Sequence, residues 1–255
     1  MNTNILPSLA LLALLSACGS ANGDGVRHLG GYTSVTNKSD ADVELQEDKD
    51  GDDLDPGDLE IVCEGGISAD VATSVDSDGN LVIDFAAEVA SILGCEVRVI
   101  SDGVVLVTND GDGVILCPDG LHGIRTIEVK GNGAVDLAAV ETEELDLLVA
   151  GNGSLNIDDV QVETLNIDLR GTGDASLAGN AVNATLSISG SGSLAAQELT
   201  VSETLDAVLT GTGNAVITVL GTVNAEVHGD AELQVYGGGA PGDISEVDGG
   251  TVTFY

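Results

Sequence analysis

Acidic side chains are the residues of this chain whose number and spacing could do chemistry. Of its 255 residues, 43 are Asp or Glu and 7 are Lys or Arg, a formal net charge of -36. Clustered carboxylates can bind calcium or perform acid–base chemistry on a polysaccharide. Eight acids recur through the repetitive part of the chain: Glu141, Glu143, Glu144, Asp158, Asp159, Glu163, Glu198 and Glu203. A solvated edge of a repeating fold gives the same recurrence, and we favour that interpretation.

A catalytic acid cluster would also need a cationic partner. The candidates in the folded part are Arg98, Arg125, Lys130 and Arg170. Asp48, Asp50 and Asp52 have the alternate spacing of an EF-hand-like calcium loop. However, Asp53 stands where that loop needs its turn glycine, and no Glu follows at the twelfth position. We therefore expect no cofactor, with calcium as a weak candidate.

Other ligand and reaction classes find little support in the sequence. The negative charge opposes binding to nucleic acid. Zinc-ligand spacing, a Ser-His-Asp order and an HExxH motif are all absent. The one GxGxxG match, at residues 237–242, contains Pro241 and lacks a surrounding βαβ unit. We expect a protein that is not an enzyme.

The N-terminus predicts export. Residues 5–15 form an apolar run too short to span a bilayer, followed by Leu15-Ser16-Ala17-Cys18. This stretch resembles a bacterial lipobox, which implies a signal peptide over residues 1–17 and lipidation of Cys18. Gly19 after the cysteine resembles outer-membrane sorting. We expect a lipid-anchored protein of the outer membrane, on its surface or its periplasmic face.

The segment after the predicted anchor changes in composition. Residues 38–60 hold eleven acids and two lysines. Such a segment buries too little apolar surface to offset its ordering entropy. We expect an acidic flexible tether over residues 18–57 and a folded domain over residues 58–255.

Three cysteines remain besides Cys18, namely Cys63, Cys95 and Cys117. An exported chain with three cysteines can form one disulfide and leave one thiol. Three pairings are possible, and the sequence does not choose among them.

A repeat of about 20 residues dominates the rest of the chain. The first glycines of its Gly-x-Gly units lie at positions 111, 131, 151, 171, 190 and 211, and a degenerate seventh copy follows at His228-Gly229. On both sides of these units the apolar residues alternate with polar ones, as at Leu145, Leu147 and Val149. Short strands at this spacing favour stacking on the equivalent strands of the preceding copy. The sequence predicts an all-β, right-handed parallel β-helix (β-solenoid), with a less regular N-terminal cap and with Leu147, Ile167 and Leu186 in one column.

The paired glycines are predicted to form corners of the coil, where a positive φ suits glycine. The predicted corner residues are Gly131, Gly133, Gly151, Gly153, Gly171, Gly173, Gly190, Gly192, Gly211 and Gly213.

The repeating unit, as in Ile127-Glu128-Val129-Lys130-Gly131-Asn132-Gly133 and Ile188-Ser189-Gly190-Ser191-Gly192, resembles the head GIN domain of bacterial autotransporter adhesins. The resemblance covers residue 58 to the C-terminus. It implies a right-handed β-helix similar to that of pectin lyases, without their catalytic residues, and a surface or adhesive role.

Two functions remain open at this point. The first is a lipid-anchored, non-enzymatic domain that contacts a cell surface, matrix or envelope polymer. The alternative is a calcium-dependent protein that binds or degrades polysaccharides. The ligand, the leaflet and the oligomeric state do not follow from the sequence.

Overall fold

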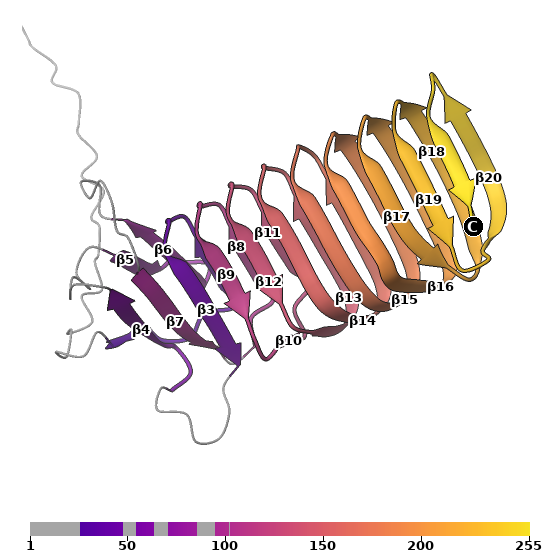
Figure 1. The fold of residues 1–255 in the computed structure, drawn as a ribbon. Coiled ribbons are helices and arrows are strands. Elements are labelled where there is room, and N and C mark those ends of the chain that lie inside the picture. Colours follow the sequence, from indigo (N-terminus) through magenta and orange to yellow (C-terminus); the bar gives the residue numbers. More distant parts are fainter. Residues whose placement is uncertain (1–25, 48–54, 64–70, 86–94, 102) are drawn as a thin grey trace, which may run out of the picture.

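The computed structural model describes residues 26–47, 55–63, 71–85, 95–101 and 103–255 (Figure 1). The strands of the N-terminal part are β1 (Val26–His28), β2 (Ser34–Asn37), β3 (Asp42–Glu47), β4 (Asp58–Cys63), β5 (Val71–Val75), β6 (Asn80–Phe85) and β7 (Cys95–Ser101). The next strands are β8 (Leu106–Asn109), β9 (Val114–Cys117), β10 (Leu121–His122), β11 (Thr126–Val129), β12 (Ala134–Leu137), β13 (Val140–Val149) and β14 (Ser154–Leu169). The remaining strands are β15 (Asp174–Gly190), β16 (Ser193–Gly211), β17 (Asn214–Val219), β18 (Thr222–Gly229), β19 (Glu232–Tyr236), β20 (Ala240–Val247) and β21 (Thr251–Phe254).

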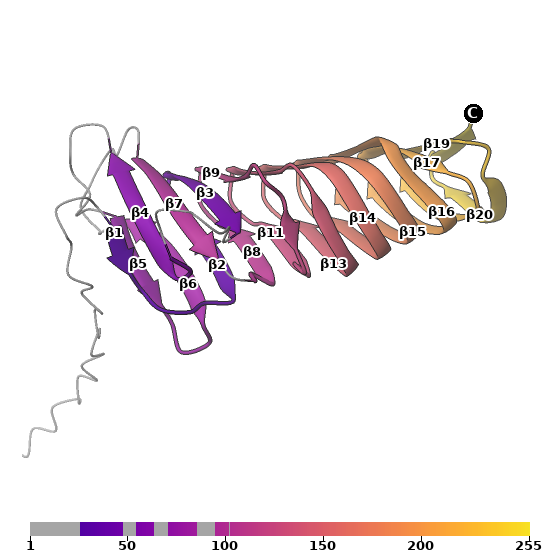
Figure 2. The same ribbon diagram turned by 90° about the horizontal axis from the view of Figure 1, so that it is seen from below.

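These strands stack into an elongated parallel β-solenoid, which confirms the predicted fold class (Figures 1 and 2). Each coil pairs with the next in register. Val140 lies beside Val160, Val160 beside Gly179, and Gly190 beside Gly211, which are offsets of 20, 19 and 21 residues. None of the described residues is helical, so none forms a helix that could cross a bilayer.

The coil has three faces. We call the first face the stack β6, β2, β8, β11, the last parts of β13 to β16, β18 and β20. The second face is the stack β7, β3, β9, β12, the first parts of β14 to β16, β17, β19 and β21. A narrow third face joins them through β10, the first part of β13 and the middle parts of β14 to β16. Long strands such as β14 turn the corner at a register shift between Ile157 and Val160.

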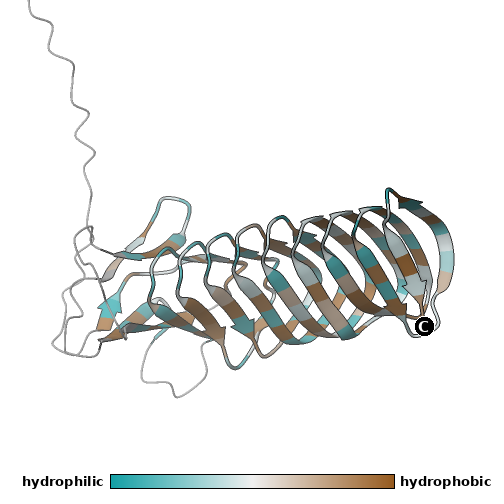
Figure 3. Ribbon diagram, turned by 45° about the horizontal axis from the view of Figure 1, so that its top comes forward, coloured by the Kyte–Doolittle hydropathy of each residue, from teal (hydrophilic) through white to brown (hydrophobic). Residues whose placement is uncertain are grey.

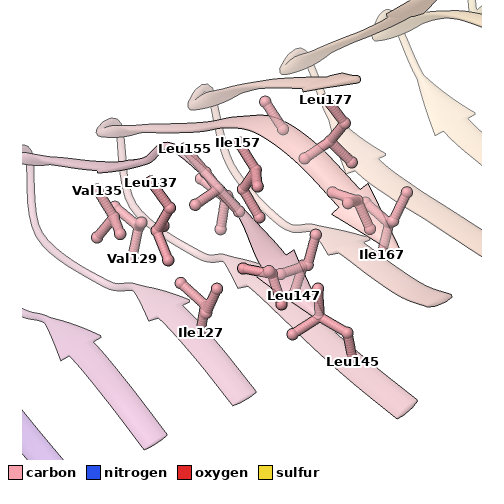
Figure 4. Close-up of a cluster of buried hydrophobic side chains, with 14 of the residues drawn as sticks. Ile127, Val129, Val135, Leu137, Leu145, Leu147, Leu155, Ile157, Ile167 and Leu177 are labelled. Atoms are coloured by element: carbon pink, nitrogen blue, oxygen red, sulfur yellow. The ribbon is translucent and has the colours of Figure 1, made fainter. Parts of the chain in front are cut away.

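Aliphatic columns fill the interior. Leu147 lies beside Ile167, which lies beside Leu186, as predicted from the repeat. Val135 and Leu155 form part of a second column, from the opposite face (Figure 4). These side chains are buried, and the outward positions between them are mostly polar, so apolar and polar bands alternate along the strands (Figure 3). Each fully buried Leu or Ile contributes about 1.5–3 kcal/mol through removal of apolar surface from water.

Residues 26–47 belong to the folded body, which corrects the predicted tether over residues 18–57. Strand β2 lies between β6 and β8, and β3 lies between β7 and β9. Composition misled the prediction, because the acids of this segment alternate with fully buried residues. Val43 and Leu45 face the core, whereas Asp42 on the same strand is exposed.

The N-terminal end is irregular, as predicted. Strand β4 runs antiparallel to β7, β1 antiparallel to β4, and β5 antiparallel to β6. These pairings cover the edges that the first parallel strands would otherwise expose.

The Gly-x-Gly units form the corner between the first and second faces. Of the ten predicted corner glycines, only Gly190 and Gly211 have φ in the left-handed region, at 145° and 120°. The expected reason is therefore wrong for most of them. The requirement is close approach: a Cβ on Gly133 would lie 2.0 Å from the carbonyl oxygen of Gly113, and one on Gly151 would lie 2.1 Å from that of Gly131.

The middle residues of these units link successive coils. Asn132 Nδ2 donates to Asp112 Oδ1 at 2.7 Å, and Asn152 Nδ2 donates to Asn132 Oδ1 at 3.0 Å. Thr172 Oγ1 donates to Asn152 Oδ1 at 2.6 Å. These side chains therefore form a polar ladder along the corner.

The two N-terminal coils close this corner with a buried amide. Asn109 Nδ2 donates to the carbonyl oxygens of Gly113 and Ala134, both at 2.7 Å. Asn37 Nδ2 donates to the carbonyl oxygen of Ala41 at 3.0 Å in the equivalent position. Because a buried amide is stable only when its hydrogen bonds are made, these contacts fix the shape of the first corners.

Candidate functional site

The eight predicted acids are spread along two corners and the third face, and all eight are exposed. Asp158, Asp159 and Glu198 lie at the corner between the second and third faces. Glu143, Glu144, Glu163 and Glu203 lie toward the first face, and Glu141 lies on the third face in register with Gln161. This distribution matches the solvated edge that we favoured.

The predicted cationic partners pair with other acids. Arg98 Nη1 lies 3.2 Å from Glu60 Oε2, and Lys130 Nζ lies 2.6 Å from Glu128 Oε2. Arg170 Nε donates to Asp168 Oδ2 at 2.7 Å. Arg125 is exposed next to β11. Three of the four candidate bases therefore each pair with an acid outside the predicted eight.

Histidine provides one further base near the acidic edge. His122 Nδ1 lies 2.8 Å from Glu47 Oε2. The hydrogen bond to Glu47 and the charge of that carboxylate raise the pKa of His122, with a smaller contribution from Glu141. This pair joins the end of β3 to β10.

Several predicted features lie outside the described residues, namely the signal peptide, Cys18 and the acids Asp48, Asp50 and Asp52. Within the described ranges, no three His, Cys, Asp or Glu side chains meet in an arrangement that could hold a metal ion. The glycines at residues 237–239 connect β19 to β20, and Gly242 lies within β20.

The outer side of the second face is hollowed in two adjoining places. The first hollow has a volume of about 310 Å³, and its lining includes Glu44, Leu116, Asp136, Asn156 and Asp158. These residues come from β3, β9, β12 and β14, which stack in that order.

The second hollow continues the first. Its volume is about 450 Å³, and it shares Asn156 and Asp158 with the first hollow. Its other outward lining residues include Ser176 and Ala178 of β15 and Ala195 of β16. We call the two hollows together the second-face trough. It crosses six stacked strands, five spacings of about 4.8 Å each, and so extends about 24 Å along the solenoid axis.

The trough combines acidic, amide and small or apolar side chains in one column along the axis. Leu116 is 40% exposed, and Ala195 is exposed in the same column four strands further along. Asn156 Nδ2 donates to Asp158 Oδ1 at 3.1 Å, which orients this carboxylate. Neither hollow is lined by Lys or Arg.

Two carboxyl groups in or next to the trough have a raised pKa. Burial and the charge of Asp158 raise the pKa of Asp136. At the end of the trough, a hydrogen bond with Glu44, followed by burial, raises the pKa of Glu96. The site is therefore suited to ligands that donate hydrogen bonds or carry positive charge. Asp136 and Asn156 were not predicted, although each occupies an outward position that the alternation identifies.

A further hollow lies on the first face near the C-terminal end. Its volume is about 590 Å³, and its lining includes Asp206, Val208, Asn224, Asp243 and Ile244. It forms where the register between β18 and β20 shifts between Val223 and Ala225. Asn224 Nδ2 donates to Asp206 Oδ1 at 2.7 Å, and its Oδ1 accepts from the backbone of Asp243. This hollow crosses fewer strands than the trough.

Comparison with solved structures supports the architecture. An adhesin described as putative from Parabacteroides merdae ATCC 43184 is 22% identical with a TM-score of 0.78, over 90% of this chain and 94% of that chain. Another, from Parabacteroides distasonis ATCC 8503, is 23% identical with a TM-score of 0.77, over 91% and 97%. A protein from the same strain, described as a putative lipid binding protein, is 18% identical with a TM-score of 0.78, over 90% and 95%. These likenesses concern the fold.

No curated protein matches the chain. A family profile does match it, over residues 31–239. The match begins within the segment that composition assigned to a tether, in agreement with the strands found there. The chain therefore belongs to the family described as "Putative auto-transporter adhesin, head GIN domain".

Proposed function

We propose that this protein is a non-enzymatic adhesion protein of the cell envelope, which binds an extended polymer in the second-face trough. The observation that carries the proposal is the continuity of the trough across six stacked strands. A polymer that lies along the solenoid axis meets a new set of side chains at every coil. Weak contacts of one kind then add along its length.

The chemistry of the lining selects the ligand class. Asp136, Asp158 and Asn156 can accept hydrogen bonds from hydroxyl or ammonium groups, and the exposed side chain of Leu116 suits the CH groups of a sugar ring. The formal net charge of -36 repels polyanions. We therefore propose a neutral or amine-bearing polysaccharide of the envelope or matrix as the ligand, and we propose no nucleic-acid partner.

We further propose that Cys18 carries the lipid anchor and that the protein lies in the outer membrane. The support is the sequence Leu15-Ser16-Ala17-Cys18 after an apolar run. Membership of an adhesin family fits a protein held at a cell surface or in the envelope.

The trough is tested by filling it. The full chain and its variants are incubated with chitosan, a neutral β-glucan and polygalacturonate, and binding is measured by calorimetry. Ala195→Tyr places a large side chain in the trough at an exposed position. We expect it to lower affinity for chitosan or the β-glucan at least tenfold, about 1.4 kcal/mol.

Ser189→Tyr is the matched control. Ser189 is exposed on the first-face part of β15 and lines neither hollow of the trough. It should bind as the unmodified chain does. Equal loss in both variants, or binding of the polyuronate alone, would contradict the proposal. Because one structural neighbour is described as lipid binding, vesicles of neutral lipid are included, and retention on them instead of the polymers would also contradict it.

The same incubations test the alternative of a polysaccharide-degrading enzyme. They are repeated with calcium, and new reducing ends and unsaturated products are measured. We expect neither product to accumulate. Depolymerisation that calcium stimulates and EDTA abolishes would show that the protein is an enzyme, and would contradict the proposed adhesive function.

A further inference from the structure

Two cysteines occupy opposed positions in an antiparallel strand pair of the N-terminal cap. Cys63 is the last residue of β4, and Cys95 is the first residue of β7. The register of this pair places Cys63 directly opposite Cys95. Directly opposed residues in antiparallel strands have Cα atoms about 4.5–5.5 Å apart. Disulfides join Cα atoms that are about 4.4–6.8 Å apart, so the backbone places the pair within reach.

The alternation of the two strands assigns positions 63 and 95 to the same face of the pair. Leu59 and Ile61, which are buried, precede Cys63 at intervals of two residues. Val97 and Val99, also buried, follow Cys95 at the same interval. The ladder pairs Leu59 with Val99 and Ile61 with Val97, so Cys63 and Cys95 form the next pair on that face.

The third cysteine is too far away to compete. Cys117 ends β9, and β3 lies between β9 and β7. Two strand spacings of about 4.8 Å separate it from β7 by at least about 9.6 Å, beyond the reach of a disulfide. Cys117 is 1% exposed, and burial raises the pKa of its thiol, so little reactive thiolate forms there.

We propose that Cys63 and Cys95 form a disulfide that fastens β4 to the end of the solenoid, and that Cys117 remains a buried thiol. The oxidant is a small-molecule or protein disulfide, R–S–S–R. The thiolate of one cysteine attacks it, forms a mixed disulfide and releases one RS⁻. The thiolate of the other attacks the mixed disulfide, forms the Cys63–Cys95 bond and releases the second RS⁻. The two protein thiols lose two electrons and two protons, and R–S–S–R becomes two R–SH.

The proposed bond would fasten the strand that covers the end of the solenoid. Strand β4 covers the edge of β7 through an antiparallel pairing of five residue pairs, and the proposed bond joins the last of these pairs. The cross-link closes a loop between positions 63 and 95 and so restricts the unfolded chain. The inference rests on the proposed envelope location only for the supply of the oxidant, because the cytoplasm keeps thiols reduced.

Mass spectrometry identifies the linkage directly. The full chain is purified in reduced form, equilibrated with oxidised glutathione, alkylated without reduction and cleaved after glutamate. Glu60, Glu64, Glu88 and Glu96 place the two cysteines in separate peptides, residues 61–64 and 89–96. We expect these peptides to be joined and two hydrogen atoms lighter than their sum. Cys117 should carry the alkyl group only after denaturation.

Thermal unfolding distinguishes a Cys63–Cys95 disulfide from two cysteine side chains that act independently. We expect Cys63→Ser, Cys95→Ser and the double variant to share one melting temperature, about 5–10 °C below that of the oxidised chain. Reductant should lower the melting temperature of the unmodified chain and of Cys117→Ala, and leave the other variants unchanged. Alkylation of both Cys63 and Cys95 in the oxidised chain, a linkage that includes Cys117, or insensitivity to reductant would overturn the proposal. None of these readouts depends on polymer binding.

Discussion

The carbonyl oxygen of Gly113 occupies the space that a side chain on Gly133 would need. An added Cβ at Gly133 would lie 2.0 Å from that oxygen, and the same relationship recurs one coil later, where Gly153 would meet Gly133. Because the obstacle is backbone in the adjacent coil, relief requires the two coils to separate. The glycines of this corner therefore set the distance between coils.

Gly133→Ala should destabilise the protein by about 1–3 kcal/mol, the range for overpacking of a close-packed site. We expect a fall in melting temperature of roughly 3–10 °C. Gly31→Ala is the control, because Gly31 has ordinary φ and an added Cβ there meets no atom within 4 Å. Similar melting temperatures for the two variants would contradict the close-approach argument.

The aliphatic columns predict a second contrast. Leu155 is 1% exposed, between Val135 and Ala175 of the neighbouring coils. Leu155→Ala should cost about 2–5 kcal/mol, since it removes buried surface and leaves a cavity. Leu220 is 56% exposed, so Leu220→Ala should change stability by less than about 0.5 kcal/mol. Denaturant titration measures both, and a smaller loss for Leu155→Ala than for Leu220→Ala would contradict the assigned core.

The trough predicts a pH effect on stability. Burial and then Asp158 raise the pKa of Asp136, so the folded state holds this proton more tightly than the unfolded state. The charged form therefore disfavours folding above the folded pKa, and this penalty disappears as pH falls toward about 4. Asp136→Asn should raise the melting temperature at pH 7 by about 1–2 °C and confer a smaller gain near pH 4.

Asp159→Asn, at an exposed corner position, controls for the loss of one negative charge. Melting curves at the two pH values decide the matter. A decrease at pH 7 for Asp136→Asn, or the same gain at both pH values, would show that Asp158 and burial do not disfavour the carboxylate.

The proposed anchor gives a prediction in cells. Cys18→Ser removes the only atom to which the proposed lipid would be attached. Detergent-phase partitioning should be lost in this variant and retained in Cys117→Ala. Unchanged partitioning of Cys18→Ser would refute lipidation at this position.

The regular coils could be predicted from sequence because each repeats its neighbour. A spacing of about 20 residues, alternate apolar positions and paired glycines coincide there, and the column through Leu147 and Ile167 follows from them. Membership of the head GIN family agrees with the predicted resemblance.

The N-terminal coils escaped prediction because their order in space differs from their order in the chain. Strand β2 stacks between β6 and β8, so its neighbours lie far away in sequence. Acidic composition concealed the alternation within β3. One feature of the sequence does point to these coils: the dipeptide Thr-Asn occurs at residues 36–37 and again at residues 108–109. The two dipeptides occupy equivalent positions before the first two corners.

The trough was beyond prediction for a different reason. Alternation shows that Asp136 and Asn156 face outward, but it does not show which face is hollow. The hollow depends on small side chains, such as Ala195, and on the register shift of β14 after Ile157. Neither feature can be read from the alternation of apolar and polar residues in the sequence.

Nuclear Overhauser contacts between backbone protons test the stacked coils most directly. In a parallel solenoid Leu147 and Ile167, twenty positions apart, lie side by side. We predict contacts between their backbone protons, repeated at the same offset along β13 and β14. Contacts between residues placed symmetrically about Gly151-Asn152-Gly153, with none between Leu147 and Ile167, would reveal an antiparallel hairpin and contradict this architecture.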